Sequence, residues 1–185
     1  MPSLGMLVMF NSGTYLSYLP PELKRWILIF TLVSTFLLPL TVIYFLSLQG
    51  IVKSVHLKTR EERLAPMVIS LILYVFCFYL IKRIDVPKLY NAFLFSGIIS
   101  IAITLLITTR FKISIHMVGL GGLTALVAFL AFHLKVDLQF YLIVVITLAG
   151  ITGTARLNLK AHTSSEIYSG YFLGLTTVLF TMLWF

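Results

Sequence analysis

The sequence has few charged residues and very few acidic ones. Of 185 residues, 11% are charged and only 6 are Asp or Glu, whereas a soluble domain carries about 25% charged residues. Hydrophobic residues make up 59% of the chain, and its mean hydropathy is +1.03. No polar tract is long enough for a soluble domain. We therefore expect an all-α integral membrane protein with one transmembrane domain over residues 1–185.

Several common features are missing. Cys77 is the single cysteine, so no intramolecular disulfide can form. Residues 1–19 lack the basic start and the clean cleavage site of a secretory signal, so we expect a retained, partial or re-entrant segment there. The sequence shows no heme, zinc or P-loop pattern, and GLGGL at 119–123 is expected to serve helix packing. We expect no cofactor, no metal and no nucleic-acid partner.

Long uncharged runs predict six membrane spans. Each run is close to the roughly 20 residues that cross the hydrocarbon core. The second is short unless Lys82 and Arg83 extend to the membrane surface. The runs cover about 27–48, 67–81, 89–109, 113–132, 138–155 and 167–185.

Alternating crossings place three linkers on one membrane face, because an even number of spans separates them. These linkers are 49–66, 110–116 and 156–166. They hold eight basic residues: Lys53, Lys58, Arg60, Arg63, Arg110, Lys112, Arg156 and Lys160. They also hold His56, His116 and His162, whereas His133 lies on the opposite face.

Basic residues at span ends are often only topology signals, and this explains Lys53, Arg110 and Lys112 well. It explains histidine poorly, because histidine carries little charge near neutral pH. Three converging linkers with His, Lys, Arg and a carboxylate favour a polar cavity at one surface. Such groups suit a phosphate: the cations donate charge-assisted hydrogen bonds, and histidine can act as nucleophile or acid.

The same linkers resemble the motifs of the type 2 phosphatidic acid phosphatase (PAP2) family of six-span lipid phosphatases. Arg156, His162 and Glu166 keep the spacing of its third motif, Ser-Arg, five residues, His, three residues, Asp. ISIH at 113–116 resembles Pro-Ser-Gly-His, and KTREERLAP at 58–66 resembles Lys, six residues, Arg-Pro. The resemblance covers residues 50–185 and implies a PAP2-like core there.

The resemblance implies a phosphohistidine mechanism without a metal. His162 would attack phosphorus, Glu166 one helical turn later would orient its ring, and His116 would protonate the leaving group. The expected phosphate-binding residues are Lys58, Ser114 and Arg156, with backbone N–H groups. Glu166 can also be a first-turn acid that follows a Thr163 or Ser164 cap, and both roles can hold together.

Three signature positions depart from the family. Ala65 stands where the family has the phosphate-clamping arginine, so Arg60 and Arg63 are the expected substitute clamps. Ile113 and Ile115 replace proline and glycine, and Ile115 adds bulk where the backbone should approach phosphate. Three functions stay open: a lipid phosphatase, a catalytically degenerate PAP2-like protein that binds a phosphorylated lipid or a protein partner, or, last, a transporter or channel.

The expected partners are the lipid bilayer and a phosphorylated membrane lipid, either a monophosphate or a diphosphate. By the resemblance, the protein is expected in a bacterial inner membrane with the site facing the periplasm. The sequence does not distinguish among the candidate lipids, and it does not define protein partners.

Overall fold

The computed structural model describes residues 1–49 and 60–185, with side chains from residue 63 onward in the second part. Within these ranges every regular element is helical. Six helical segments are long and apolar enough to cross a membrane, which confirms the predicted number of spans. The elements are α1 (Pro2–Phe10), η1 (Tyr15–Tyr18), α2 (Pro21–Leu32), η2 (Val33–Leu37), α3 (Leu38–Leu48), α4 (Arg60–Lys82), α5 (Lys88–Thr108), α6 (Ile115–His133), α7 (Gln139–Asn158) and α8 (Ser164–Trp184).

Local sequence signals set the helix ends. Pro21 begins α2 and Pro87 precedes α5, where a missing N–H costs nothing because the first turn has no internal acceptor for it. Thr163 caps α8. Lys135 and Lys160 follow α6 and α7 with φ of 52° and 49°, so each chain reversal uses a left-handed residue.

The first span is one long helix, Pro21–Leu48, with a π-helical turn inside it. In this turn, η2, the N–H of Leu38 donates to the carbonyl of Val33. Pro39 follows directly and has no N–H to give to the preceding turn. The widened turn and the proline are a known cause of a helix bend, and they separate α2 from α3.

Helices α6 and α8 pack closely through glycine, as GLGGL predicted. A Cβ added at Gly121 would overlap the backbone oxygen of Tyr171, and one added at Gly174 would overlap that of Val118. A Cβ at Gly170 would lie 2.7 Å from the oxygen of Ser114. Small residues let the two backbones touch, and this contact fixes α8 against the start of α6.

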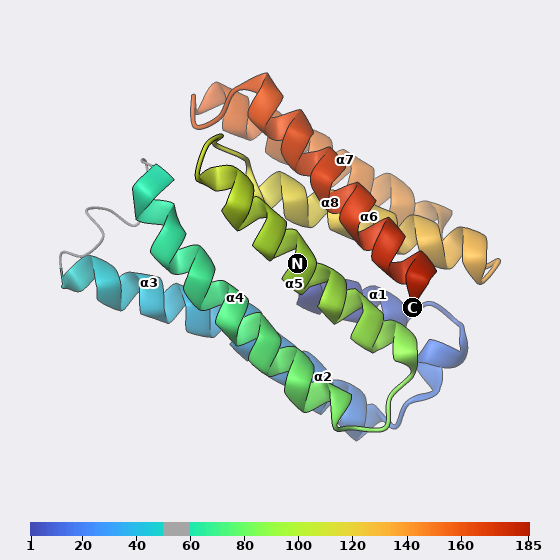
Figure 1. The fold of residues 1–185 in the computed structure, drawn as a ribbon. Coiled ribbons are helices and arrows are strands. Elements are labelled where there is room, and N and C mark those ends of the chain that lie inside the picture. The colour runs from blue at the N-terminus through green and yellow to red at the C-terminus, as the bar shows by residue number, and fades with distance from the viewer. Residues whose placement is uncertain (50–59) are drawn as a thin grey trace.

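The N-terminal segment contains α1, which has 9 residues and is too short to cross the roughly 30 Å hydrocarbon core. It begins near the middle of the bundle, where Figure 1 marks the N-terminus, and packs against α2, α5 and α6. Gly5 makes room for the ring of Phe93. At the far end of this segment, the Tyr90 hydroxyl donates to the carbonyl of Leu16 at 2.5 Å.

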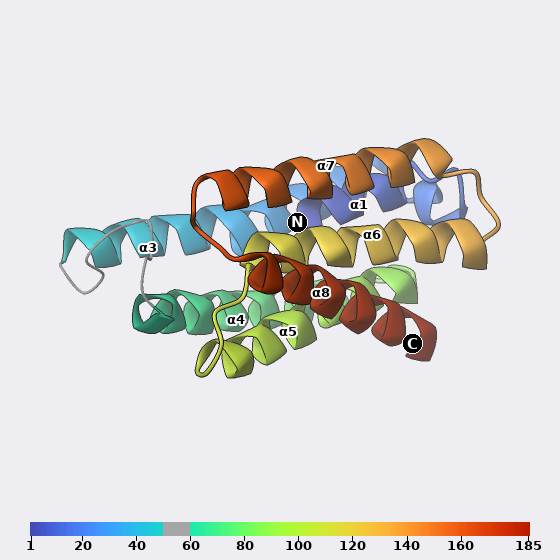
Figure 2. The same cartoon turned by 90° about the horizontal axis from the view of Figure 1, so that it is seen from above.

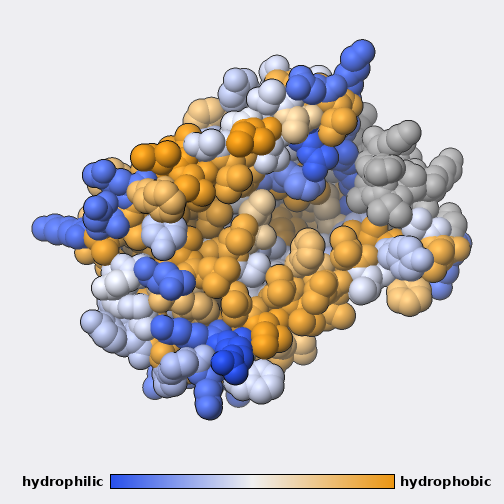
Figure 3. All heavy atoms as spheres, turned by 180° about the vertical axis from the view of Figure 1, so that it is seen from behind, coloured by the Kyte–Doolittle hydropathy of each residue, from blue (hydrophilic) through white to orange (hydrophobic). Residues whose placement is uncertain are grey.

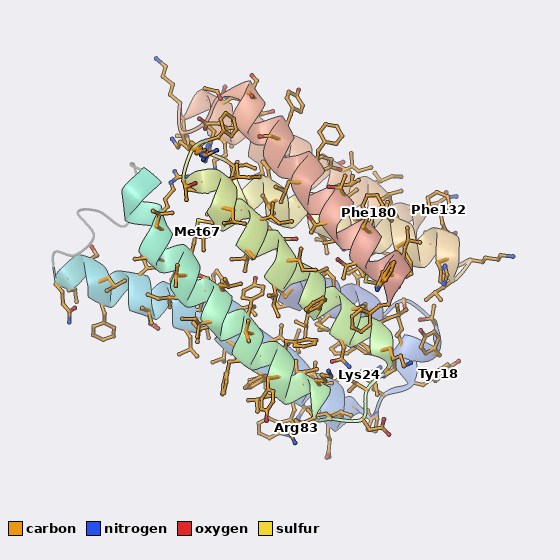
Figure 4. The ribbon with its side chains drawn as sticks, in the orientation of Figure 1. Tyr18, Lys24, Met67, Arg83, Phe132 and Phe180 are labelled. Atoms are coloured by element: carbon orange, nitrogen blue, oxygen red, sulfur yellow. The ribbon has the colours of Figure 1, made fainter. Side chains whose placement is uncertain are left out.

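The helices form two layers with α6 between them (Figure 2): α1, α3 and α7 lie on one side, and α4, α5 and α8 on the other. Large apolar side chains cover the outside. Phe132 and Phe180, labelled in Figure 4, are 80% and 72% exposed. Exposed apolar surface of this extent indicates contact with lipid.

Candidate functional site

The starts of α4, α6 and α8 lie at one end of the bundle, together with the ends of α5 and α7 (Figure 1). Arg83 and Lys24 mark the other end (Figure 4). The structure brings together six side chains at the first end: Arg63, Lys112, His116, Arg156, His162 and Glu166. We call these six residues the polar cluster. Lys58 and His56 lie outside the described residues.

His162 and Glu166 form a hydrogen-bonded pair. The distance from His162 Nδ1 to Glu166 Oε2 is 2.6 Å, and the two side chains are only 5% and 13% exposed. A carboxylate on Nδ1 keeps the proton there and leaves the Nε2 lone pair available. This is the geometry that activates a histidine nucleophile.

The chain around Thr163 holds this pair in place. The Thr163 hydroxyl accepts from the N–H of Glu166, and Glu166 Oε2 accepts from the N–H of Thr163, both at 3.4 Å. This capping box satisfies backbone donors at the start of α8. Glu166 therefore caps its helix and orients His162 with the same carboxylate oxygen.

The second histidine lies beside an arginine from another helix. Arg156 Nη2 at the end of α7 is 3.0 Å from His116 Nε2 in the first turn of α6. Guanidinium can only donate, so Nε2 must accept and the ring is neutral in this arrangement. His116 can donate a proton from Nε2 only after Arg156 moves away from this nitrogen.

Arg63 is the cation that α4 adds to the polar cluster. Its charge acts on both His116 and His162, and its side chain lines the cavity beside His116. Ala65 is exposed and lines neither cavity described below, because residues two apart point to different sides of a helix. The arginine near the site is therefore Arg63, while the side chain of Arg60 lies outside the described set.

Lys112 is a site residue that the sequence analysis assigned to topology alone. It lines a pocket of about 310 Å³ together with His162 and Glu166, which we call the outer pocket. Its Nζ donates to the carbonyl of Ala161 at 2.8 Å. Lys112 lies two residues before Ser114, directly before the ISIH motif, and this position was the sequence signal for a role at the site.

Ser114 is next to the cluster but lines neither cavity. Its side chain is fully buried, and its hydroxyl has no hydrogen-bond partner among the described residues. Its N–H donates to the carbonyl of Glu166 at 3.1 Å, which ties the start of α6 to α8. Ile113 is buried, and Ile115 is 42% exposed and lines the larger cavity.

Burial lowers the pKa of His162 below its usual range, and the charges of Arg63 and Lys112 lower it further. The hydrogen bond and the charge of Glu166 act in the opposite direction. His162 is therefore neutral at pH 7, which is the form that can attack an electrophile.

A larger cavity lies beneath the polar cluster. Its volume is about 380 Å³, and Arg63 and His116 line it at the end nearest the cluster. Other lining residues come from α1, η2, α3, α4, α5, α6 and α8. We call this space the inner cavity. Figure 3 shows a recess hollowed into the face seen from behind.

No family model, no curated protein and no solved structure matches this chain.

Proposed function

We propose that this protein is a membrane lipid phosphatase that hydrolyses a phosphomonoester or diphosphate of a lipid through a phosphohistidine intermediate. The observation that carries the proposal is the buried His162–Glu166 pair at 2.6 Å. Three cations, Arg63, Lys112 and Arg156, surround this pair and the second histidine. Fixed cations stabilise a phosphoryl group in the way that a metal would otherwise do.

In the first step, His162 Nε2 attacks phosphorus, and the bond from phosphorus to the ester oxygen breaks. Arg156 turns from His116 to the phosphoryl oxygens, and His116, having taken a proton from solvent, donates it to the leaving alkoxide. In the second step, water attacks phosphorus and gives its proton to His116. The P–N bond breaks, which releases phosphate and restores neutral His162.

The outer pocket supports this assignment of roles. Lys112, Lys160, His162 and Glu166 line it, so a phosphate there meets positive charge on one side and the nucleophile on the other. We further propose, from the family resemblance, that the membrane is a bacterial inner membrane and that this pocket faces the periplasm.

One observation favours a second function, a catalytically degenerate protein that only binds a phosphorylated lipid. Arg156 occupies Nε2 of His116, which is the nitrogen that would protonate the leaving group. If Arg156 stays there when phosphate binds, the chain has a nucleophile without an acid, and the polar cluster is a binding site alone.

The deciding experiment measures phosphate release from a panel of phosphorylated lipids by purified protein, together with covalent labelling of the protein by radioactive phosphate. We expect acid-labile labelling, and we expect His162→Ala to abolish both labelling and release while lipid binding remains. His133→Ala is the matched control, because His133 stacks on Phe129 at the opposite face, with ring centroids 4.8 Å apart. Wild-type protein that binds these lipids without labelling or release would establish the degenerate function.

A further inference from the structure

The inner cavity begins where the polar cluster ends. Arg63 and His116 belong to the cluster and also line the cavity. Below them the lining is mainly apolar, with residues such as Met67, Phe93, Ile101, Leu123 and Val178. A ligand with an anionic group at the cluster would therefore place its next atoms in an apolar space.

Five hydroxyls on the cavity wall do not call for a polar ligand. The wall carries the hydroxyls of Thr35, Ser70, Ser96, Ser100 and Thr104. Each of them already donates to a carbonyl of its own helix, at 2.6 to 2.8 Å. Hydroxyls that are satisfied in this way can lie against hydrocarbon without an unmet hydrogen bond.

The cavity has a defined floor. Tyr74 on α4, Phe93 on α5 and Leu123 on α6 are its deepest lining residues, measured along each helix from the cluster end. The ring of Phe93 rests against Gly5 of α1, which has no side chain to displace it. The short N-terminal helix therefore supports the floor from below.

The depth of the inner cavity is the same when it is measured along α4 and along α5. Three turns of α4 separate Arg63 from Tyr74, and three turns of α5 separate Thr104 from Phe93, about 16 Å in each case. An extended chain advances about 1.2 Å per bond, since an extended residue of three bonds spans roughly 3.6 Å. A straight hydrocarbon chain of about 13 carbons would fill this depth.

We propose that the inner cavity binds the hydrocarbon chain of the phosphorylated lipid and limits the part of the chain that it holds to about 13 carbons between the level of Arg63 and the Phe93 floor. The inference rests on the proposed function only for the phosphate at the polar cluster. The charge at the cluster end, the apolar wall and the aromatic residues at the deep end match an amphiphile with one anionic end. Longer chains have to bend out of the cavity.

The experiment uses monoalkyl phosphates of about 8 to 18 carbons, a range that brackets the ~13 carbons of the cavity. Binding is measured in lipid nanodiscs at equal mole fraction in the bilayer. The bilayer and the cavity are similarly apolar, so transfer of the alkyl chain from one to the other is favoured in neither direction by apolar burial alone. The measured affinity therefore depends on how well the length of the chain fits the cavity. We expect level affinity up to about 13 carbons and a fall of about tenfold for the longest chains, equivalent to roughly 1.4 kcal/mol.

Two variants should move this limit in opposite directions. Ser100→Leu fills the cavity about one helical turn below its mouth and should shift the limit to shorter chains. Phe93→Ala removes the floor and should shift it to longer ones. Opposite shifts cannot both come from misfolding. Thr147→Leu is the matched control for Ser100→Leu, because Thr147 is exposed on α7 and lines neither cavity.

The outcomes separate this inference from the proposed function. A length limit that moves in both variants supports the cavity as a chain site even if the wild-type protein releases no phosphate. Phosphate release with a length profile that is the same in wild type, Ser100→Leu and Phe93→Ala would overturn the chain site and leave the phosphatase proposal standing.

Discussion

Arg63 and Ala65, two residues apart on α4, differ in their position relative to the polar cluster. Ala65 occupies the place that the family motif gives to arginine, yet it is exposed and away from both cavities. Arg63 lies beside His116 in the inner cavity, and its charge acts on both histidines. In the proposed phosphate site, the clamp expected from the motif is therefore assigned to Arg63, two residues earlier.

Replacing Arg63 should weaken phosphate binding far more than adding an arginine at position 65 strengthens it. A charged hydrogen bond contributes about 1.5 to 3 kcal/mol, so Arg63→Ala should reduce vanadate affinity roughly ten- to a hundredfold. Ala65→Arg should change it little, because that side chain faces outward. Isothermal titration with vanadate measures the affinity of both variants. Equally small changes in Arg63→Ala and Ala65→Arg would show that Arg63 does not bind the phosphate.

The pH dependence of phosphate release should follow His162. Its lowered pKa keeps the ring neutral below the ordinary value of about 6.5, so release should continue below that pH. Lys112→Ala removes a positive charge and raises the pKa of His162, which moves the acid limb to higher pH. Lys135→Ala, at the opposite face, should leave the profile unchanged. Release rates from about pH 5 to pH 8 test this, and an acid limb that does not move in Lys112→Ala would contradict it.

At the scale of elements, the contact between α6 and α8 positions the chemistry. His116 is in the first turn of α6, and Glu166 is in the first turn of α8. The N–H of Ser114 binds the carbonyl of Glu166, and the glycines along both helices let their backbones touch. The two histidine-bearing ends therefore depend on how closely these helices pack.

A methyl group in this contact should be costly. Gly174→Ala would force Cβ against the backbone oxygen of Val118, and overpacking of this kind costs about 1 to 3 kcal/mol. Gly150→Ala is the control: its Cβ would meet nothing within 4 Å, and alanine favours a helix over glycine by about 1 kcal/mol. Thermal unfolding in detergent should show a lower Tm than wild type for Gly174→Ala and no decrease in Tm for Gly150→Ala. If Gly174→Ala and wild type had equal Tm values, the contact between α6 and α8 would be loose.

The six spans could be predicted because an apolar run of about 20 residues has few alternatives in a bilayer. The three linkers could be predicted to lie on one membrane face because an even number of spans separates them. Arg63 was one of the two expected substitutes for Ala65, but the sequence alone could not place its side chain beside His116, because α4 is apolar on most sides and its rotation depends on packing. The inner cavity could not be predicted either, since residues of the N-terminal segment and of five spans contribute to its wall.

At the scale of the whole molecule, the polar cluster marks one membrane face. Lys160 and Lys135 are both exposed, both follow a helix and both have positive φ, yet they lie at opposite ends of the bundle. They form a matched pair for determining which face is outside, and the single native cysteine, Cys77, is buried.

We expect Lys160→Cys to react with a membrane-impermeant maleimide in intact cells and Lys135→Cys to react only after permeabilisation. This result follows if the polar cluster faces the periplasm. The extent of labelling on a gel measures it, and the native chain with Cys77 alone provides the background. The reverse pattern would place the polar cluster in the cytoplasm.

Glu166 both caps α8 and hydrogen-bonds His162, and these two roles have an evolutionary consequence. The capping box needs the longer acid three positions after threonine, so selection for a folded α8 keeps glutamate there, where the resembled motif has aspartate. A lineage that lost the reaction would still retain Glu166 and Thr163. His116 has no comparable role in its helix and would drift first, so among descendants of this sequence the identity at position 116 would record whether the chemistry was kept.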